Sequence, residues 1–339
     1  MTSPRLPLLL LGLLAGAASA ASAAPSHDLY ICAAVNKGYV IGSKIVTVNG
    51  LFRRGATGEW QHLGYNDTSV RAVDFDPRNH AVIYTAANNG CWRSLDGGQH
   101  WRITTSWDMT EPLDVTIDPH APDTVYLALP DGIAVSPDRG QTWPRRESGL
   151  PERGKYTQVV EVDRTQGGRV LAGCESGIYL TTNGAESWTR VLPTDTTVDD
   201  IKQSPHDPRL WLAVTQSNGA WISRDGGLSW KQLAGVPSAH ALYNVAFDPL
   251  HPSRLAIGSW TLGVLTSEDG GATWTARNAG IPDPHKVWRI AVDPDSGSLY
   301  ASVVGEALYS SEDFGRTWKR GGLEASTVNA FLFLPVSTP

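Results

Sequence analysis

The sequence predicts an all-β protein, a seven-bladed β-propeller whose ring is closed by a C-terminal strand that joins the first blade. A motif ending in tryptophan recurs with a period near 43 residues, which suits a four-stranded propeller blade. Short apolar segments alternate with turns, and 34 glycines and 22 prolines supply those turns. The first and last apolar segments correspond to different strands of one blade, so the two chain ends complete a ring.

The repeated motif reads Ser-x-Asp-x-Gly-x-(Ser/Thr)-Trp in four copies, and three further periods carry weaker versions. In one weaker copy Asn183 replaces the aspartate, and the first period keeps only its tryptophan. The successive tryptophans are Trp60, Trp101, Trp143, Trp188, Trp230, Trp274 and Trp318. Their spacings are 41, 42, 45, 42, 44 and 44 residues, without the 3.6-residue periodicity of a helical repeat.

The motif has a structural role that follows from its residue types. Its aspartate can accept backbone N–H groups of its own turn, and its serine or threonine adds local hydrogen bonds. Its glycine takes backbone angles that other residues resist, and its tryptophan buries a large apolar surface beside the neighbouring blade. We therefore predict a turn between the third and fourth strands, and we assign these carboxylates neither catalysis nor calcium binding.

Each period carries a first strand nearest the axis, a second strand, a third strand before the motif, and a fourth that opens at the tryptophan. The first strands end at Asp-Pro or a related pair. They are expected at Val70–Pro77, Leu113–Pro119, Val159–Arg164, Val198–Pro205, Tyr243–Pro249 and Trp288–Pro294.

The chain ends predict how the ring closes. Leu29–Val35 resembles a second strand, and Val328–Pro335 resembles the first strands. Pairing them in one blade removes the open edges of an unclosed array. An inserted stretch, Gly38–Asn49, separates the second and third strands of this blade, and the sequence leaves open whether it lines the axis or caps an edge.

The N-terminus has the pattern of a secretory signal over residues 1–23, which leaves 24–339 as a single propeller domain. Arg5 precedes a short apolar run, Leu8–Leu14, and small residues follow at the expected cleavage point. No later apolar stretch is long enough to cross a membrane. We expect an exported protein, periplasmic or extracellular, without an integral membrane segment and monomeric.

Charge and cysteine content exclude several function classes. Removing residues 1–23 takes away one arginine and no acid, so 28 basic residues become 27 against 34 acidic ones, a net charge of −7. This balance disfavours nucleic acid as a partner. Cys32, Cys91 and Cys174 allow at most one disulfide, and buried free thiols are the simpler expectation. No metal-binding spacing or cofactor motif occurs, so we expect neither a metal nor a cofactor.

The motif resembles the Asp-box, or BNR, repeat of sialidases, sortilin-type receptors, xyloglucan hydrolases and photosystem II assembly factors, and the resemblance covers nearly all of residues 24–339. Phe52-Arg53-Arg54-Gly55 departs from the Phe-Arg-Ile-Pro motif of sialidases. Thr47 stands where the xyloglucan hydrolases carry a catalytic aspartate, and those enzymes use two propellers. The single-propeller assembly factors match best in size, which implies binding of protein partners.

Strand direction places the candidate site at the rim opposite the motif turns, where the first strands begin. Ligands of propellers enter at the axial mouth, and every first strand carries a polar residue at or next to the same position. The candidate ligand-binding residues are Arg71, Trp107, Tyr243, Asn244, Trp260, Trp288 and Arg289. Arg71 and Arg289 could hold an anion, or form salt bridges with Asp114 or Asp200.

Two functions follow from these residues. The first is a binding or assembly protein that holds a glycan, peptide or protein partner at the mouth. The alternative is a glycoside hydrolase, in which Asp114 and either Asp199 or Asp200 form the pair of carboxyls that such enzymes need about 5–10 Å apart. We favour the binding protein, because fold alone does not establish catalysis. A polar channel without a specific ligand is the remaining alternative.

Overall fold

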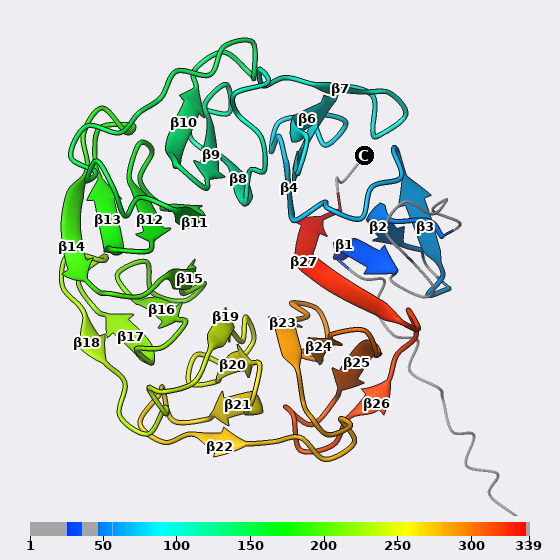
Figure 1. The fold of residues 1–339 in the computed structure, drawn as a ribbon. Helices are drawn as coiled ribbons and strands as arrows, with labels where there is room; N and C mark the ends of the chain where they lie inside the picture. Colours follow the sequence, from blue (N-terminus) through cyan, green and yellow to red (C-terminus); the bar gives the residue numbers. More distant parts are fainter. Residues whose placement is uncertain (1–25, 36–46, 56, 337–339) are drawn as a thin grey trace, which may run out of the picture.

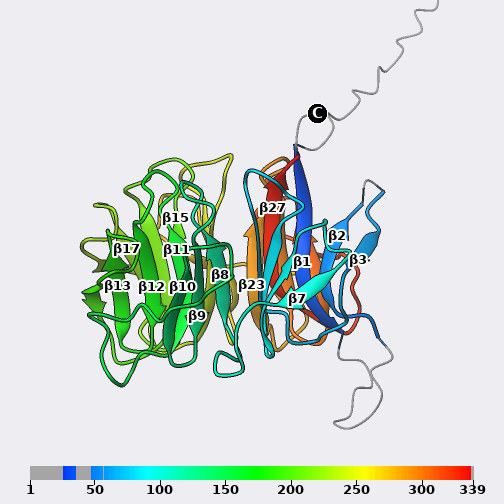
Figure 2. The ribbon, with the colours of Figure 1, turned by 90° about the horizontal axis from the view of Figure 1, so that it is seen from above.

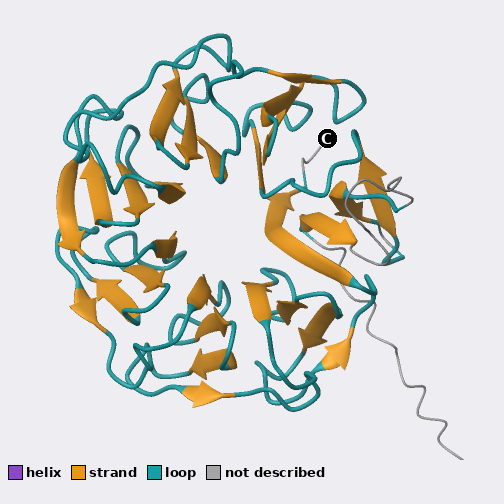
Figure 3. Cartoon of the chain, viewed as in Figure 1, coloured by secondary structure: helices purple, strands orange, loops and turns teal. Residues whose placement is uncertain are grey.

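The computed structural model describes residues 26–35, 47–55 and 57–336. Within these ranges the protein is all-β, without helices, and seven antiparallel sheets are arranged radially around a central axis (Figures 1 and 3). The predicted seven-bladed propeller is therefore confirmed. Seen from the side, the blades form one layer of similar height around the axis (Figure 2). The predicted signal, residues 1–23, lies outside the described residues, as does most of the inserted stretch Gly38–Asn49.

Blade 1 takes its innermost strand from the C-terminus. Its other strands, and those of blades 2 to 4, follow in chain order. Blade 1 contains β27 (Ser326–Pro335), β1 (His27–Val35), β2 (Gly50–Arg54) and β3 (Trp60–Leu63). Blade 2 contains β4 (Ala72–Phe75), β5 (Ile83–Ala87), β6 (Gly90–Ser94) and β7 (Trp101–Ile103). Blade 3 contains β8 (Asp114–Ile117), β9 (Val125–Leu129) and β10 (Gly132–Ser136). Blade 4 contains β11 (Thr157–Val162), β12 (Val170–Cys174), β13 (Gly177–Thr181) and β14 (Thr189–Pro193).

The last three blades have short outer strands. Blade 5 contains β15 (Val198–Gln203), β16 (Trp211–Thr215), β17 (Ala220–Ser223) and β18 (Lys231–Gln232). Blade 6 contains β19 (Leu242–Phe247), β20 (Leu255–Ser259), β21 (Gly263–Ser267) and β22 (Thr275–Ala276). Blade 7 contains β23 (Val287–Val292), β24 (Leu299–Val303), β25 (Ala307–Ser311) and β26 (Lys319–Arg320).

The ring closes in blade 1 as the chain ends predict. The sheet order is β27-β1-β2-β3, with the C-terminal strand innermost. β27 pairs antiparallel with β1 from His27↔Pro335 to Val35↔Ser326. Figure 1 shows the two ends of the chain, red and blue, side by side in this blade. The backbone groups that would otherwise form open edges are thereby paired.

The hydrophobic core is divided among the contacts between neighbouring blades. The second strands lie in the middle of each sheet, so both of their faces are covered, and β9 is buried at every residue. Leu127 in this strand is completely buried in a cluster that joins blades 2 and 3. Burying such a side chain stabilises the fold by about 1.5–3 kcal/mol.

The turns between third and fourth strands have the predicted hydrogen bonds. In blade 6, Asp269 Oδ1 accepts a hydrogen bond from the Thr273 N–H (2.9 Å), and Ser267 Oγ accepts one from the Gly271 N–H (2.9 Å). Hydrogen bonds from Thr273 lower the pKa of Asp269 to about 2. The Asn183 copy keeps the main bond, from the Ser187 N–H to Oδ1 (3.1 Å). These carboxylates are committed to their own turns.

Blade 3 differs from the expected four-stranded sheet. The segment after Trp143 forms only one isolated bridge, Ala134↔Arg145, instead of a fourth strand. Pro144 lies directly before that bridge, and proline has no N–H to donate to a ladder. The three cysteines are free and buried, in agreement with the sequence.

Candidate ligand-binding mouth

A cavity of about 340 Å³ lies at the end of the axis where the first strands begin. We call this end the mouth. The cavity is lined by Thr68, Ser69, Arg71, Asn88, Leu113, Gln158, Trp288, Arg289 and Asn329. Because these residues come from five blades, they meet only when the ring closes. Of the candidate ligand-binding residues, the structure brings Arg71, Trp288 and Arg289 together at the cavity.

A β-bulge recurs at the mouth in five of the seven first strands. In each of β11, β15, β19, β23 and β27, the register with the second strand skips one residue. The skipped residues are Gln158, Asp199, Tyr243, Trp288 and Asn329. A bulge leaves one residue outside the ladder and redirects its side chain. The mouth is therefore built from a repeated backbone irregularity as well as from polar residue types.

Arg289 is held by backbone carbonyls and has no acidic partner among the described residues. Its Nε donates to the carbonyl of Asn329 (3.1 Å), and its Nη1 donates to the carbonyls of Tyr243 and Trp288 (both 3.1 Å). Within the same ranges, no carboxylate lies within ion-pair distance of it, and Nη2 has no hydrogen-bond partner. Burial lowers the pKa of Arg289, and nearby acids oppose this effect. The guanidinium is thus fixed in position with two N–H groups left over.

Arg71 is a second cation on the cavity wall. Its Nη2 donates to Asn88 Oδ1 at 3.3 Å, and no carboxylate of the described chain pairs with it. The salt bridges to Asp114 or Asp200 that the sequence left open do not form for either arginine. The cavity thus presents two guanidinium groups without acidic partners among the described residues, and guanidinium groups are donors that suit carboxylate or phosphate oxygens.

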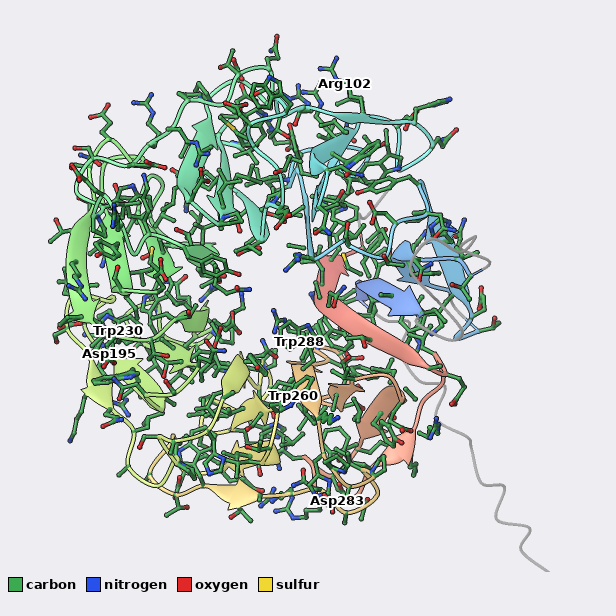
Figure 4. The ribbon with its side chains drawn as sticks, in the orientation of Figure 1. Arg102, Asp195, Trp230, Trp260, Asp283 and Trp288 are labelled. Carbon is green, nitrogen blue, oxygen red and sulfur yellow. The ribbon has the colours of Figure 1, made fainter. Side chains whose placement is uncertain are left out.

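A row of three aromatic side chains, Trp260, Tyr243 and Trp288, ends against Arg289. The Tyr243 ring lies 4.6 Å from that of Trp288 and 6.0 Å from that of Trp260, between centroids. The Arg289 guanidinium lies over the Trp288 ring at 4.4 Å. Figure 4 shows Trp288 and Trp260 on the inner side of blades 6 and 7, with Trp288 nearer the axis. The Trp288 ring supports the guanidinium, since cation–π contacts of this kind are attractive.

Two candidate acids face the next blade and bind its backbone. Asp200 Oδ2 accepts hydrogen bonds from Asn244 Nδ2 (2.6 Å) and the Val245 N–H (3.0 Å). Asp114 Oδ2 accepts one from the Val160 N–H (3.0 Å). Asn244, a candidate ligand-binding residue, is buried in the same kind of contact. These side chains connect blades, and their hydrogen-bonding capacity is largely used.

Asp199 has a different environment from Asp200. It is the bulge residue of β15, and its Oδ2 is buried without a hydrogen-bond partner among the described residues. Burial raises the pKa of Asp199 to about 7, against the opposing effect of Arg289. A carboxyl with this pKa is partly protonated at neutral pH, so it can donate as well as accept a hydrogen bond.

A further charged group in the first strands was missed by sequence reasoning. Lys202 Nζ lies 2.8 Å from Glu161 and 3.6 Å from Asp200. Asp74, in blade 2, accepts a hydrogen bond from the Ile117 N–H (2.7 Å). Burial raises the pKa of Asp74 to about 7 and also raises the pKa of Glu161. The signal was a charged residue inside the first strand, two positions after its start in blade 2 and four positions after its start in blades 4 and 5.

Trp107 and Trp260, two of the candidate ligand-binding residues, lie in environments that differ from each other. Trp107, in the loop between β7 and β8, is 90% exposed and does not line the cavity. Trp260 contacts Tyr243, with Lys286 Nζ over its ring at 5.7 Å.

No trio of His, Cys, Asp or Glu side chains in the described ranges is arranged to hold a metal ion. The described part of the chain also contains no helix that could span a membrane.

Comparisons with known proteins place the chain among propellers of two kinds. No protein-family model matches the chain. A xyloglucanase from a Paenibacillus species is 25% identical over 281 residues, and the match covers 74% of this chain and 26% of the xyloglucanase. The photosystem II assembly lipoprotein Ycf48 of Synechococcus is 22% identical over 278 residues, covering 77% of this chain and 78% of that protein. The chain thus spans about a quarter of the length of the xyloglucanase.

Solved structures give the same two groups. A GH74 enzyme of Niastella koreensis aligns with a TM-score of 0.67 at 18% identity, covering 80% of this chain and 51% of that chain. Ycf48 bound to D1 peptide aligns with a TM-score of 0.56 at 17% identity, covering 74% and 81%. At these identities the structural likeness concerns the fold. The chain is a seven-bladed β-propeller that is similar in sequence to xyloglucanases and to Ycf48.

Proposed function

We propose that this protein is an exported, monomeric binding or assembly propeller that holds an acidic group of a peptide, protein or glycan at its mouth. The observation that carries this proposal is the pair Arg71 and Arg289. Both guanidinium groups reach the cavity without a carboxylate partner among the described residues, and the carbonyls around Arg289 fix its orientation. Charge-assisted hydrogen bonds from the remaining N–H groups of these arginines to a carboxylate, sulfate or phosphate fit this arrangement.

Binding without catalysis is supported by the state of the carboxylates. Asp114 and Asp200 accept backbone N–H groups of the next blade, so both carboxyls take part in contacts between blades. The two groups of similar proteins include one protein solved with a bound peptide and others named as xyloglucanases. Either kind of ligand can enter an open axial mouth.

The test is a binding screen with one altered arginine. Purified protein is applied to arrays of neutral and acidic oligosaccharides and of acidic peptides, together with its Arg289→Gln and Arg102→Gln variants. Arg102 lies on the outer strand β7, away from the axis (Figure 4). We expect an acidic ligand to be retained, with at least tenfold weaker binding after Arg289→Gln and unchanged binding after Arg102→Gln. Binding of neutral ligands alone, or equal loss in both variants, contradicts the proposal.

A second candidate, a glycoside hydrolase, is favoured by one observation. Asp199 has a buried, unpartnered oxygen and a pKa raised to about 7 by burial, which suits a general acid near neutral pH. Release of reducing sugar from xyloglucan measures this activity directly. Turnover that disappears in Asp199→Asn and persists in Asp195→Asn, an exposed carboxylate on the outer side (Figure 4), would establish the enzyme over the binding protein.

A further inference from the structure

We propose that Asp199 is a pH switch for the mouth: when ionised it competes with an acidic ligand for the charge of Arg289, and when protonated it permits the ligand to bind. This inference rests on the proposed function and adds the regulation of the same site. It assigns a role to a carboxyl whose buried Oδ2 makes no hydrogen bond to the described part of the ring.

The bulge takes Asp199 out of the ladder of its strand, although Asp199 is not one of the residues that line the cavity. Asp199 is skipped between Val198 and Asp200 in the ladder of β15 with β16. It occupies the same bulge position as Gln158 and Trp288, and both of those residues line the cavity. Asp200, the next residue, faces blade 6 instead. The bulge therefore gives the two neighbouring carboxyls different environments, with Asp200 in the contact between blades and Asp199 outside the ladder.

The groups that act on the charge of Asp199 include a single cation among the described residues. Arg289, from β23, attracts the ionised form, whereas Asp200, on the same strand, repels it. Tyr243, from β19, and Tyr156, in the segment before β11, also interact electrostatically with Asp199. Both tyrosines have pKa values raised by burial, so they remain neutral over the pH range in which Asp199 titrates.

Asp199 and Arg289 interact without forming an ion pair. Their charged atoms are more than 4.0 Å apart, since the described residues contain no salt bridge between them, and Arg289 Nη2 stays available to a ligand. A bound anion at Nη2 offsets the positive charge of Arg289 that favours ionised Asp199, so it favours the protonated form of Asp199.

Linkage turns this arrangement into a pH dependence. If binding an anion promotes protonation of Asp199, protonation of Asp199 strengthens anion binding by the same factor. One linked proton changes affinity by at most about tenfold per pH unit. Burial, opposed by Arg289, leaves the pKa of Asp199 at about 7. We therefore expect acidic ligands to bind below pH 7 and to be released above it.

Inorganic sulfate is the probe, because it remains a dianion throughout the range from pH 6 to pH 8.5. Calorimetric titration of the full-length protein is expected to show sulfate binding about tenfold weaker at pH 8.5 than at pH 6. Titrations in buffers of different ionisation heat are expected to show uptake of up to one proton near pH 7. Asn in place of Asp199 mimics the protonated acid, so Asp199→Asn is expected to keep the pH 6 affinity at both pH values without proton uptake.

The matched control is Asp195→Asn, which removes an exposed carboxylate from the outer side of the ring and is expected to keep the wild-type pH dependence. Melting temperatures verify that all variants are folded. An equal pH dependence in wild type and Asp199→Asn overturns the switch and leaves the proposed function standing. Failure of sulfate to bind wild type at pH 6 also overturns the switch, whereas the ligand arrays decide the proposed function separately.

Discussion

The Asp200 carboxylate accepts a 2.6 Å hydrogen bond from the Asn244 side-chain amide, and this contact joins blade 5 to blade 6. Asn244 in turn accepts a 2.6 Å hydrogen bond from the Ile290 N–H of blade 7. Three successive blades are thus connected by two buried polar side chains. Such networks stabilise a structure only when every member is satisfied, which makes them sensitive to single substitutions.

Asp200→Ala is expected to destabilise the ring strongly. It leaves the Asn244 amide and the Val245 N–H without their acceptor, and each unsatisfied buried group costs about 1–3 kcal/mol. We expect a loss of about 2–4 kcal/mol in the free energy of unfolding, measured by urea denaturation. Asp195→Ala, at an exposed position, is expected to change stability by less than about 0.5 kcal/mol. Similar losses for both variants would refute the role given to Asp200.

Lys202→Met is expected to destabilise the protein more at pH 8 than at pH 5. Burial lowers the pKa of Lys202, but the carboxylates of Glu161, Asp200 and Asp114 outweigh this effect and raise it. Without the ammonium these acids repel one another when ionised, and protonation at lower pH relieves the repulsion. Because the Lys202 side chain is 39% exposed, solvent screening limits the expected loss at pH 8 to about 1–2 kcal/mol. Denaturation at the two pH values measures it, and an equal loss at both contradicts the prediction.

The wild-type protein is expected to lose stability as the pH rises from about 4 to about 7. Burial raises the pKa values of Asp74 and Asp114 to about 7 in the folded state, whereas an unfolded aspartate titrates near 3.9. Between these values the folded state binds more protons than the unfolded state, so the free energy of unfolding falls with increasing pH. Urea denaturation at pH 5 and pH 7.5 tests this prediction. Asp114→Asn is expected to reduce the slope and Asp195→Asn to leave it unchanged, whereas a stability that rises over this range opposes the assignment.

The turn at Asp138 can be compared with the equivalent turn of blade 4, in which Asn183 replaces the aspartate. Its carboxylate accepts hydrogen bonds from the N–H groups of Gln141 and Thr142 and from the Thr142 hydroxyl. Asp138→Ala removes these acceptors and is expected to cost about 1–2 kcal/mol. Asp138→Asn is expected to cost less, because Asn183 serves the equivalent turn of blade 4 through its Oδ1. Melting temperatures of the two variants decide the order, and the reverse order would contradict this account of the turn.

The residues of the mouth show how far the sequence could predict the candidate site. The polar positions at the starts of the first strands could be found because each repeat aligns with the next, and Arg71, Trp288 and Arg289 do line the cavity. The sequence could not show which side chain faces the mouth and which faces the next blade. A β-bulge shifts by one residue which side chains point to each face of a strand. The residue types give no signal of the bulge that separates Asp199 from Asp200.

The sequence by itself determined the number of blades, the turn chemistry and the closure of the ring. These features depend on local hydrogen bonds, such as those within the five residues from Asp269 to Thr273, and on a repeat that is visible in one chain. Only the tertiary structure decided that the Lys202 ammonium lies beside Glu161, and that Arg71 and Arg289 meet at one cavity without acidic partners among the described residues. Those pairs come from different blades, so their distances depend on how the closed ring packs the first strands around its axis.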